Sequence, residues 1–216
     1  MFFCSVRRAV TILTSDRSCD QNIIQKFVRK SDQNVVQRFG QIRGGPFLIR
    51  AIVRAVGEQP ELNAHMDAQA EVIRQFDGVD VGLATQAPDG LKVPVIRGAE
   101  GLDLWETATR IEELSTAVRD GRARPEELTG STITVTSLGK LGALASTPIV
   151  NSPEVAIVGV NRMVVRPLWD GSGFVPRTVM NLSSSFDHRA VDGWEAATFV
   201  ARLKELLETP ALLFVG

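Results

Sequence analysis

The sequence predicts an α/β fold in which helices pack on a mixed β-sheet, and three observations lead to this expectation. Its 216 residues suffice for one domain or at most two small ones. Hydrophobic residues make up 44% of the chain, which is enough for a sizeable core. Helix-like and strand-like patterns of apolar residues are interspersed, without the steady strand–helix–strand order of a purely parallel sheet.

Residues 1–45 differ in composition from the rest and are predicted to form a divergent N-terminal arm. Within them, residues 20–27 (DQNIIQKF) recur as residues 32–39 (DQNVVQRF). Two copies are too few for a solenoid, so the repeat indicates either a pair of short amphipathic turns or a loosely ordered arm. A Gly-Gly-Pro sequence then breaks the chain, and the main domain is expected over residues 46–216.

The main domain opens with a helix and then turns to strands. Residues 46–56 have apolar residues at helical spacing, with a proline suited to the first turn. Residues 72–73 and 79–84 have the composition of short strands. Residues 91–96 are predicted to form one further strand, and because Pro94 lies inside it, we expect that strand at a sheet edge or a bulge.

A second helix and a run of strands complete the pattern. Asp103 precedes a long amphipathic helix. Residues 132–136 alternate, with Ile133 and Val135 on one face and three threonines on the other. The remaining strands are expected at 155–160, 164–168, 175–179 and 180–186, with a hairpin turn at 169–173 and a final helix that stops before Pro210.

Composition excludes several classes of function. The 24 basic and 25 acidic residues give a net charge of -1, without the basic excess of proteins that bind nucleic acids or anionic membranes. No apolar run approaches the roughly 20 residues of a membrane-spanning helix. Cys4 and Cys19 cannot staple the fold, and with two distant histidines they indicate no metal site. A reducing compartment is expected: the cytoplasm, or the mitochondrial matrix in a eukaryote.

The first candidate for chemistry is the segment 187–193 (DHRAVDG), between a strand and the final helix. If the strand period continues, His188 lies on the apolar face, and a partly desolvated imidazole stays neutral and can accept a proton. Asp192 would order this loop or pair with a nearby arginine. The alternative is a buried structural histidine followed by a helix-capping aspartate.

A second candidate lies where the strand 132–136 ends. Thr136 and Ser137 bring two hydroxyl groups to a glycine turn, and a hydroxyl so placed could donate to an oxyanion. The alternative is a threonine that simply suits a strand end. No nucleophile elbow, Walker loop or dinucleotide fingerprint is present. His65 has no candidate partner nearby in the sequence and is expected at the surface.

Residues 181–193 (NLSSSFDHRAVDG) resemble the active-site signature of the dihydrolipoyl acyltransferases, the core subunits of 2-oxoacid dehydrogenase complexes. The shorter pattern His-x-x-x-Asp-Gly also occurs in chloramphenicol acetyltransferase and in peptide-synthetase condensation domains, so alone it names only the superfamily. Further segments resemble the family's catalytic domain in family order over roughly residues 46–215: PFLIRAIVRAVGEQPELNA, VGLATQAPDGLKVPVIR, ELTGSTITVTSLGKLG, STPIVNSPEVAIVGVNRM and ETPALLF. TSLG, STPIVN and NLSSSFDHR look most like the branched-chain members.

The resemblance implies a chloramphenicol-acetyltransferase-like, two-layer α/β sandwich and a dihydrolipoyllysine-residue acyltransferase. Acyl groups would pass between a dihydrolipoyl thioester and coenzyme A. His188 would be the general base and Asp192 its companion, while Thr136 would supply the oxyanion hydroxyl where serine is the commoner residue. Ser137 and Asn161 fall on positions that resemble coenzyme A contacts.

The resemblance also implies partners. Family members form homotrimers with the base and the hydroxyl on different subunits, and the trimers build a hollow core. Lipoyl domains, the decarboxylase and dihydrolipoyl dehydrogenase would complete the complex. These 216 residues hold no segment that resembles a lipoyl or subunit-binding domain, so the lipoyl group is expected on a domain absent from this chain.

Two departures from the family pattern keep alternatives open. Residues 5–10 (SVRRAV) resemble the start of the family's N-terminal stretch, but residues 11–45 do not continue it. The glycine pair usual after TSLG is here Gly142 and Ala143. The alternatives are a small-molecule acetyltransferase of the same fold and a non-catalytic core remnant.

Overall fold

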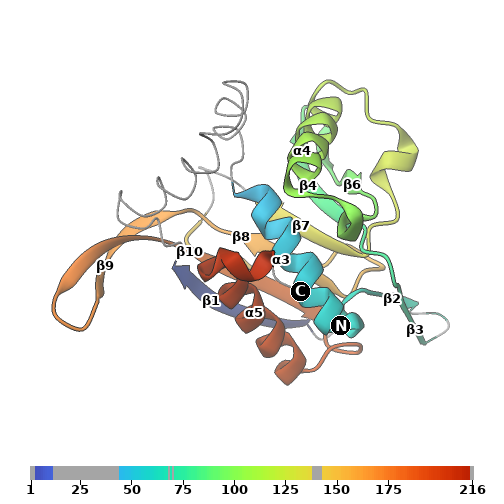
Figure 1. The fold of residues 1–216 in the computed structure, drawn as a ribbon. Helices are drawn as coiled ribbons and strands as arrows, with labels where there is room; N and C mark the ends of the chain where they lie inside the picture. Colours follow the sequence, from blue (N-terminus) through green and yellow to red (C-terminus); the bar gives the residue numbers. More distant parts are fainter. Residues whose placement is uncertain (1–2, 12–43, 68, 70, 138–142, 215–216) are drawn as a thin grey trace.

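The computed structural model describes residues 3–11, 44–67, 69, 71–137 and 143–214, which form a large sheet with helices against it (Figure 1). The helices are α3 (Gly45–Glu58), α4 (Leu104–Arg119) and α5 (Gly193–Glu208), with 3-10 turns η1 (Pro60–Leu62), η2 (Ala99–Gly101), η3 (Pro125–Leu128) and η5 (Pro210–Leu213). The strands are β1 (Phe3–Thr11), β2 (Ala64–Asp67), β3 (Val72–Gln75), β4 (Val81–Ala87), β5 (Gly90–Lys92), β6 (Val95–Ile96), β7 (Ile133–Ser137), β8 (Ala156–Val160), β9 (Val164–Trp169) and β10 (Phe174–Asp187).

Both parallel and antiparallel pairs occur in the large sheet. Its strand order is β1-β10-β8-β7-β4-β5, with β6 also paired to β4 and β9 to β10. β4, β7 and β8 run parallel to one another, whereas the other pairs are antiparallel. β2 and β3 form a separate antiparallel pair. The mixed sheet predicted from the sequence is confirmed.

The three helices form the second layer. α5 packs on β1 and β10, α4 packs on β4, and α3 contacts both of these helices (Figure 1). The rings of Phe186 in β10 and Phe199 in α5 are fully buried and meet edge to face, with their centroids 6.2 Å apart. Arg202 of α5 pairs with Glu58 of α3 at 2.7 Å. This arrangement confirms the predicted two-layer α/β sandwich.

Local sequence signals set where the helices begin. Asp103 and Asp192 cap α4 and α5, and each forms a reciprocal pair with a glutamate three residues later. Pro46 occupies the first turn of α3, where its missing N–H costs no hydrogen bond. All three predicted helices are confirmed within a residue or two of their expected ends.

Two strand predictions require correction. The single strand expected over 91–96 is split into β5 and β6, because Pro94 cannot donate to a ladder; its carbonyl still accepts from the Leu83 N–H at 2.8 Å. Both pieces pair only with β4, which confirms the expected edge position. Conversely, the strands expected at 175–179 and 180–186 form one strand, β10. It pairs first with β9 and then with β8, so the partner changes while the strand continues.

The N-terminal strand β1 lies at one edge of the sheet. It runs antiparallel to β10, from Phe3 opposite Asp187 to Thr11 opposite Val179. Most of the segment predicted as a divergent arm, including the repeated sequences, lies outside the described residues, so the boundary near residue 45 stays a prediction. No helix in the described part of the chain is both long and apolar enough to cross a membrane.

Candidate active site

A cavity of about 490 Å³ lies beside β7 and β8. Thr134 and Thr136 of β7 contribute to it, as does Asn161 just after β8. The segment 146–152 supplies much of the remaining wall. The full lining consists of Ala84, Leu91, Val93, Thr134, Thr136, Ala143, Ser146, Thr147, Pro148, Ile149, Val150, Asn151, Ser152, Ile157, Val160 and Asn161.

Gly159 allows that wall to approach the sheet closely. A Cβ at this position would lie 2.9 Å from the Ser183 carbonyl oxygen and 3.1 Å from Ser146 Oγ. Pro148 would be 3.4 Å away. Because Gly159 has no side chain, the segment that carries Ser146 and Pro148 packs directly over β8 and shapes the cavity.

The two hydroxyl candidates at the end of β7 are placed differently. Thr136 is half-buried and lines the cavity, with Ala84 and Gly159 as its partners on the neighbouring strands. Its hydroxyl can donate a hydrogen bond to a group bound there. Ser137 is exposed and does not belong to the lining. The sequence thus located one cavity hydroxyl, and the neighbouring serine lies outside.

Asn161 connects the cavity to β10. Its side chain is 6% exposed, and Nδ2 donates to the Asn181 carbonyl and to Ser183 Oγ, both at 2.9 Å. Its backbone N–H donates to the same Asn181 carbonyl at 3.1 Å. The amide nitrogen is therefore fixed by the protein itself. The predicted contact of Asn161 with coenzyme A stays a prediction.

His188 occupies a different environment from the one expected. β10 ends at Asp187, and the backbone turns there, because the N–H groups of Ala190 and Val191 both donate to the Asp187 carbonyl at 3.0 Å. The strand period thus stops one residue before His188, whose side chain is exposed. The expected burial on the apolar face is wrong for the single chain.

Asp192 orders the loop as a helix cap. Its carboxylate accepts from the Glu195 N–H at 2.8 Å, and the Glu195 carboxylate accepts from the Asp192 N–H at 2.8 Å. The arginine of the motif, Arg189, pairs instead with Asp187, with Nε 2.9 Å from Oδ1. The hydrogen bonds from Arg189 lower the pKa of Asp187 below its usual value. The capping alternative describes Asp192 in this structure.

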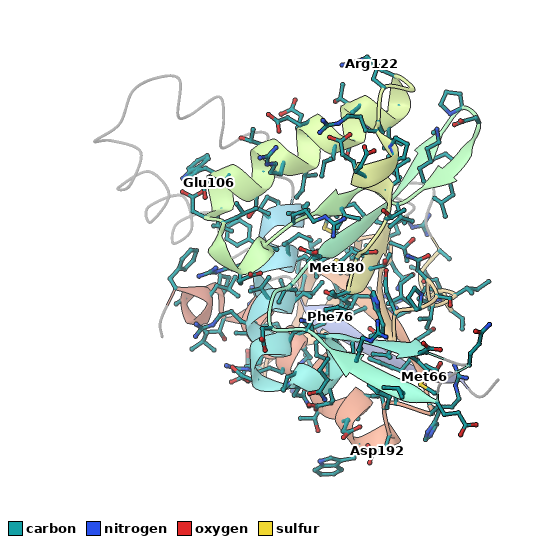
Figure 2. The ribbon with its side chains drawn as sticks, turned by 90° about the vertical axis from the view of Figure 1, so that its right-hand side faces the viewer. Met66, Phe76, Glu106, Arg122, Met180 and Asp192 are labelled. Carbon is teal, nitrogen blue, oxygen red and sulfur yellow. The ribbon has the colours of Figure 1, made fainter. Side chains whose placement is uncertain are left out.

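The hydroxyl and the imidazole lie at opposite ends of the sheet. In the sheet, Thr136 of β7 pairs with Gly159 of β8, and Gly159 pairs in turn with Ser183 of β10. β10 continues from Ser183 for about 13 Å to Asp187, and His188 follows at the turn beyond it. Figure 2 shows Asp192, from the same loop, at the outer end of α5 and away from Met180 in the middle of β10. One chain cannot place both groups on one reacting carbonyl.

A buried polar cluster adjoins the cavity and was not predicted from the sequence. Glu154, only 2% exposed, precedes β8, and its Oε1 accepts three hydrogen bonds. The donors are Ser131 Oγ at 2.5 Å, Thr134 Oγ1 at 2.8 Å and Asn151 Nδ2 at 2.8 Å. Burial raises the pKa of Glu154 above its usual value, although the three donors act in the opposite direction. The available signal was an acidic residue directly before an apolar strand.

His65 belongs to the edge of this cluster, contrary to the expectation that it lies free at the surface. It is half-buried, and its Nε2 is 2.8 Å from the Ser131 carbonyl. Since a carbonyl only accepts, Nε2 carries the hydrogen. The ring also meets Phe76 edge to face, with centroids 4.6 Å apart. Its partners come from distant parts of the chain, which is why sequence neighbours gave no indication of them.

The family was established by comparison with known proteins. The model of the family described as 2-oxoacid dehydrogenases acyltransferase (catalytic domain) matches residues 7–215. The chain belongs to this acyltransferase family. Residues 138–142, which include part of the TSLG turn, fall within the match but outside the described residues.

Relatives within the family include components of branched-chain alpha-keto acid, pyruvate and 2-oxoglutarate dehydrogenase complexes. The lipoamide acyltransferase component of the branched-chain alpha-keto acid dehydrogenase complex of Pseudomonas aeruginosa is 55% identical over 170 residues, or 79% of this chain and 40% of the relative. The dihydrolipoyllysine-residue succinyltransferase of the Azotobacter vinelandii 2-oxoglutarate dehydrogenase complex is 40% identical over 169 residues, or 78% of this chain and 42% of the relative. The chain therefore spans less than half the length of these relatives, and the predicted similarity to branched-chain members is confirmed.

Solved structures of family members share the fold. A dihydrolipoamide acetyltransferase of Azotobacter vinelandii, studied for a serine, a histidine and an asparagine in its catalytic mechanism, has a TM-score of 0.85 at 31% identity, over 99% of this chain and 84% of that one. The cubic core of a pyruvate dehydrogenase multienzyme complex has a TM-score of 0.84 at 32% identity, with the same coverage. Chloramphenicol acetyltransferase has a TM-score of 0.54 at 15% identity over 95% of this chain and 88% of that one, which shows a common fold alone.

Proposed function

We propose that the chain is the catalytic domain of a dihydrolipoyllysine-residue acyltransferase and moves acyl groups between a dihydrolipoyl thioester and coenzyme A. The main support is the family match over residues 7–215. The similarity to branched-chain relatives favours branched acyl groups as substrates. Apolar side chains in the cavity, among them Val93, Ile157 and Val160, suit such a group.

The chemistry follows from two side chains. A thiol has a pKa near 8.5 and is mostly protonated at neutral pH, so His188 would take the proton of coenzyme A. The resulting thiolate attacks the thioester carbonyl and forms a tetrahedral oxyanion, to which the Thr136 hydroxyl donates. The bond between carbonyl carbon and dihydrolipoyl sulfur then breaks. His188 returns the proton to the departing sulfur.

We place this reaction between two copies of the chain in a homotrimer. The separation of Thr136 from His188 along the sheet supports this placement. Apolar side chains near both groups are exposed in the single chain: Leu91 (64%) and Ile149 (83%) line the cavity, and Trp194 (81%) follows the histidine loop. Contact between copies would cover such surfaces and desolvate the imidazole.

Within the complete protein, the proposed partners are the lipoyl domains, the decarboxylase and dihydrolipoyl dehydrogenase. The trimers would join into a larger hollow core. A solved family member described as a cubic core supports this part of the proposal. We place the protein in the cytoplasm, or in the mitochondrial matrix of a eukaryote.

Acyl exchange tests the proposal directly. The purified chain is assayed with free dihydrolipoamide and, in turn, isobutyryl-, acetyl- and succinyl-coenzyme A, with chloramphenicol as a competing acceptor. We expect transfer to dihydrolipoamide, fastest from the isobutyryl donor, and none to chloramphenicol. Transfer to chloramphenicol alone would instead identify a small-molecule acetyltransferase. An assembled chain without any transfer would point to a non-catalytic core.

A further inference from the structure

Glu154 lies one hydrogen bond from the cavity without belonging to its lining. Two of its three donors, Thr134 and Asn151, are lining residues that come from different segments of the chain. Thr134 comes from the central strand β7, and Asn151 comes from the wall segment. The third donor, Ser131, precedes β7 and ties the carboxyl to the beginning of that strand. One buried carboxyl oxygen thus connects β7 to the wall segment.

We propose that Glu154 is a positioning residue for the proposed acyl transfer: through Thr134 and Asn151 it fixes β7, which presents the Thr136 hydroxyl, relative to the wall segment 146–152. This inference rests on the proposed function. Glu154 itself touches no reacting atom.

Stability alone does not explain a carboxyl group at this position. Its second oxygen, Oε2, is buried and has no hydrogen-bond partner among the described residues. Burying a carboxyl oxygen without a partner is unfavourable, and well-packed apolar residues often replace buried polar groups without loss of stability. A buried group left partly unsatisfied in a folded protein calls for another explanation, and a role in the adjoining site supplies one.

The register of β7 connects this contact to the oxyanion donor. Thr134 and Thr136 are two residues apart on one strand, so their side chains lie on the same face. Thr134 is 1% exposed and fixed by Glu154, and a shift of β7 at this point moves the Thr136 hydroxyl with it. Displacements of about 1 Å can lower rates by about 100-fold, because a transition-state hydrogen bond is sensitive to distance.

Four variants separate positioning from simple structural support. Glu154→Leu removes the acceptor, Glu154→Gln keeps a neutral acceptor of similar shape, and Thr134→Val removes one donor. The matched control is Thr107→Val in α4, which also loses a buried hydroxyl hydrogen bond, here to the Asp103 carbonyl at 2.6 Å. Each variant and the wild type are assayed for kcat and KM with dihydrolipoamide and isobutyryl-coenzyme A, normalised to assembled protein.

If Glu154 positions Thr136, kcat should fall in the variants that lose hydrogen bonds to the Glu154 carboxyl group. We expect kcat to fall about 10- to 100-fold in Glu154→Leu and about 5- to 10-fold in Thr134→Val, with KM changed less than about twofold. Glu154→Gln should recover kcat to within about threefold of wild type because the acceptor is retained. The control should lower stability and leave kcat unchanged.

Two results would overturn the inference while leaving the proposed function intact. One is an active wild type whose Thr134→Val variant has the same kcat as the Thr107→Val control; this comparison holds even where Glu154→Leu fails to fold. The other is a Glu154→Gln variant that assembles but loses as much kcat as Glu154→Leu. A wild type that assembles and transfers no acyl group overturns the proposed function and this inference together.

Discussion

The two ends of the sheet present their functional groups in opposite ways. Where β7 and β8 finish, Thr136 and Asn161 line a cavity. Where β10 finishes, His188 is exposed, and Asp192 is engaged in capping α5. At the first end the functional groups line a cavity within the chain, whereas at the second end the His188 imidazole is exposed to solvent.

This difference separates the two halves of a proposed reaction. A hydrogen-bond donor for an oxyanion works best when it is fixed beforehand in a cavity that excludes water. A base that must act on a neighbouring chain has to project from its own chain, and contact between the chains then desolvates it. In the single chain, Thr136 and His188 differ by about five residues in strand register. The proposal that they act from separate chains can therefore be tested by removing each side chain in turn.

The largest effect is expected from His188→Ala. Removing the base should lower kcat about 10²- to 10⁴-fold, the usual contribution of general acid–base catalysis. Because the side chain is exposed, the melting temperature and the assembled mass should stay near wild type. Steady-state kinetics together with thermal unfolding and light scattering check both statements. Unchanged turnover in a correctly assembled variant would remove His188 from the mechanism.

Thr136→Ala tests the enclosed half and should lower kcat about 10²- to 10³-fold, with little change in KM. Thr136→Ser keeps the hydroxyl and should retain much of the activity, which also fits the serine usual in the family. The serine and alanine variants are compared under the same assay. If they behave alike, the hydroxyl serves the strand end and not the reaction.

Mixing the two inactive variants should restore activity. In randomly mixed trimers of His188→Ala and Thr136→Ala chains, about a quarter of the sites would join an intact threonine to an intact neighbouring histidine. The measurement is kcat per site after dissociation and reassociation of equimolar mixtures. Each variant treated alone is the control. Mixed trimers with no gain over the controls would contradict the shared site.

Much of the fold could be predicted because local signals agree with it. Capping aspartates and helical spacing identified α4 and α5, and Pro94 identified an edge strand. The length of β10 could not be predicted, since residues 175–179 and 180–186 differ in partner and not in backbone conformation. Pairing partners are a tertiary property that a single strand's sequence does not encode.

The sequence could predict which residue types take part in the candidate site. It could not predict how deeply each side chain is buried. Thr136 and Asn161 do line one cavity, but Ser137 is exposed and outside the lining, and His188 is exposed because the strand ends one residue before it. Glu154 was missed because two of its three donors, Ser131 and Thr134, lie 23 and 20 residues away in the sequence.

Gly159→Ala tests whether close packing shapes the enclosed half. The new Cβ would lie 2.9 Å from the Ser183 carbonyl oxygen, which is backbone and cannot move aside easily. We expect a loss of about 1–3 kcal/mol in the free energy of unfolding, together with a lower kcat as the segment 146–148 shifts. Gly57→Ala in α3, where no atom lies within 4 Å of the added Cβ, is the matched control. Equal stability of the two variants would contradict the close approach.

The smallest expected effect is a pair of opposite pH dependences, one from Glu154 and one from Asp187. Because burial raises the pKa of Glu154, the folded chain keeps this proton where the unfolded chain, with the ordinary value of 4.5, has lost it. The contribution of Glu154 to stability is therefore full below pH 4.5 and declines as pH rises from 4.5 through the folded-state pKa. Hydrogen bonds from Arg189 lower the pKa of Asp187, so its contribution is full above the ordinary value of 3.8 and is lost as pH falls from there.

The pH dependence of stability that Glu154 causes should disappear in Glu154→Gln, and the one that Asp187 causes should disappear in Asp187→Asn. Chemical unfolding of Glu154→Gln should give a flatter stability profile above pH 4.5 than wild type, because an amide does not titrate in that range. Asp187→Asn should flatten the stability profile below pH 3.8 and leave the decline above pH 4.5 unchanged. A Glu154→Gln profile parallel to wild type from pH 4.5 to 8 would show that the buried carboxyl ionises as readily as an exposed one. The contrast between a buried carboxyl group that retains its proton and an ion-paired one that loses it would then fail.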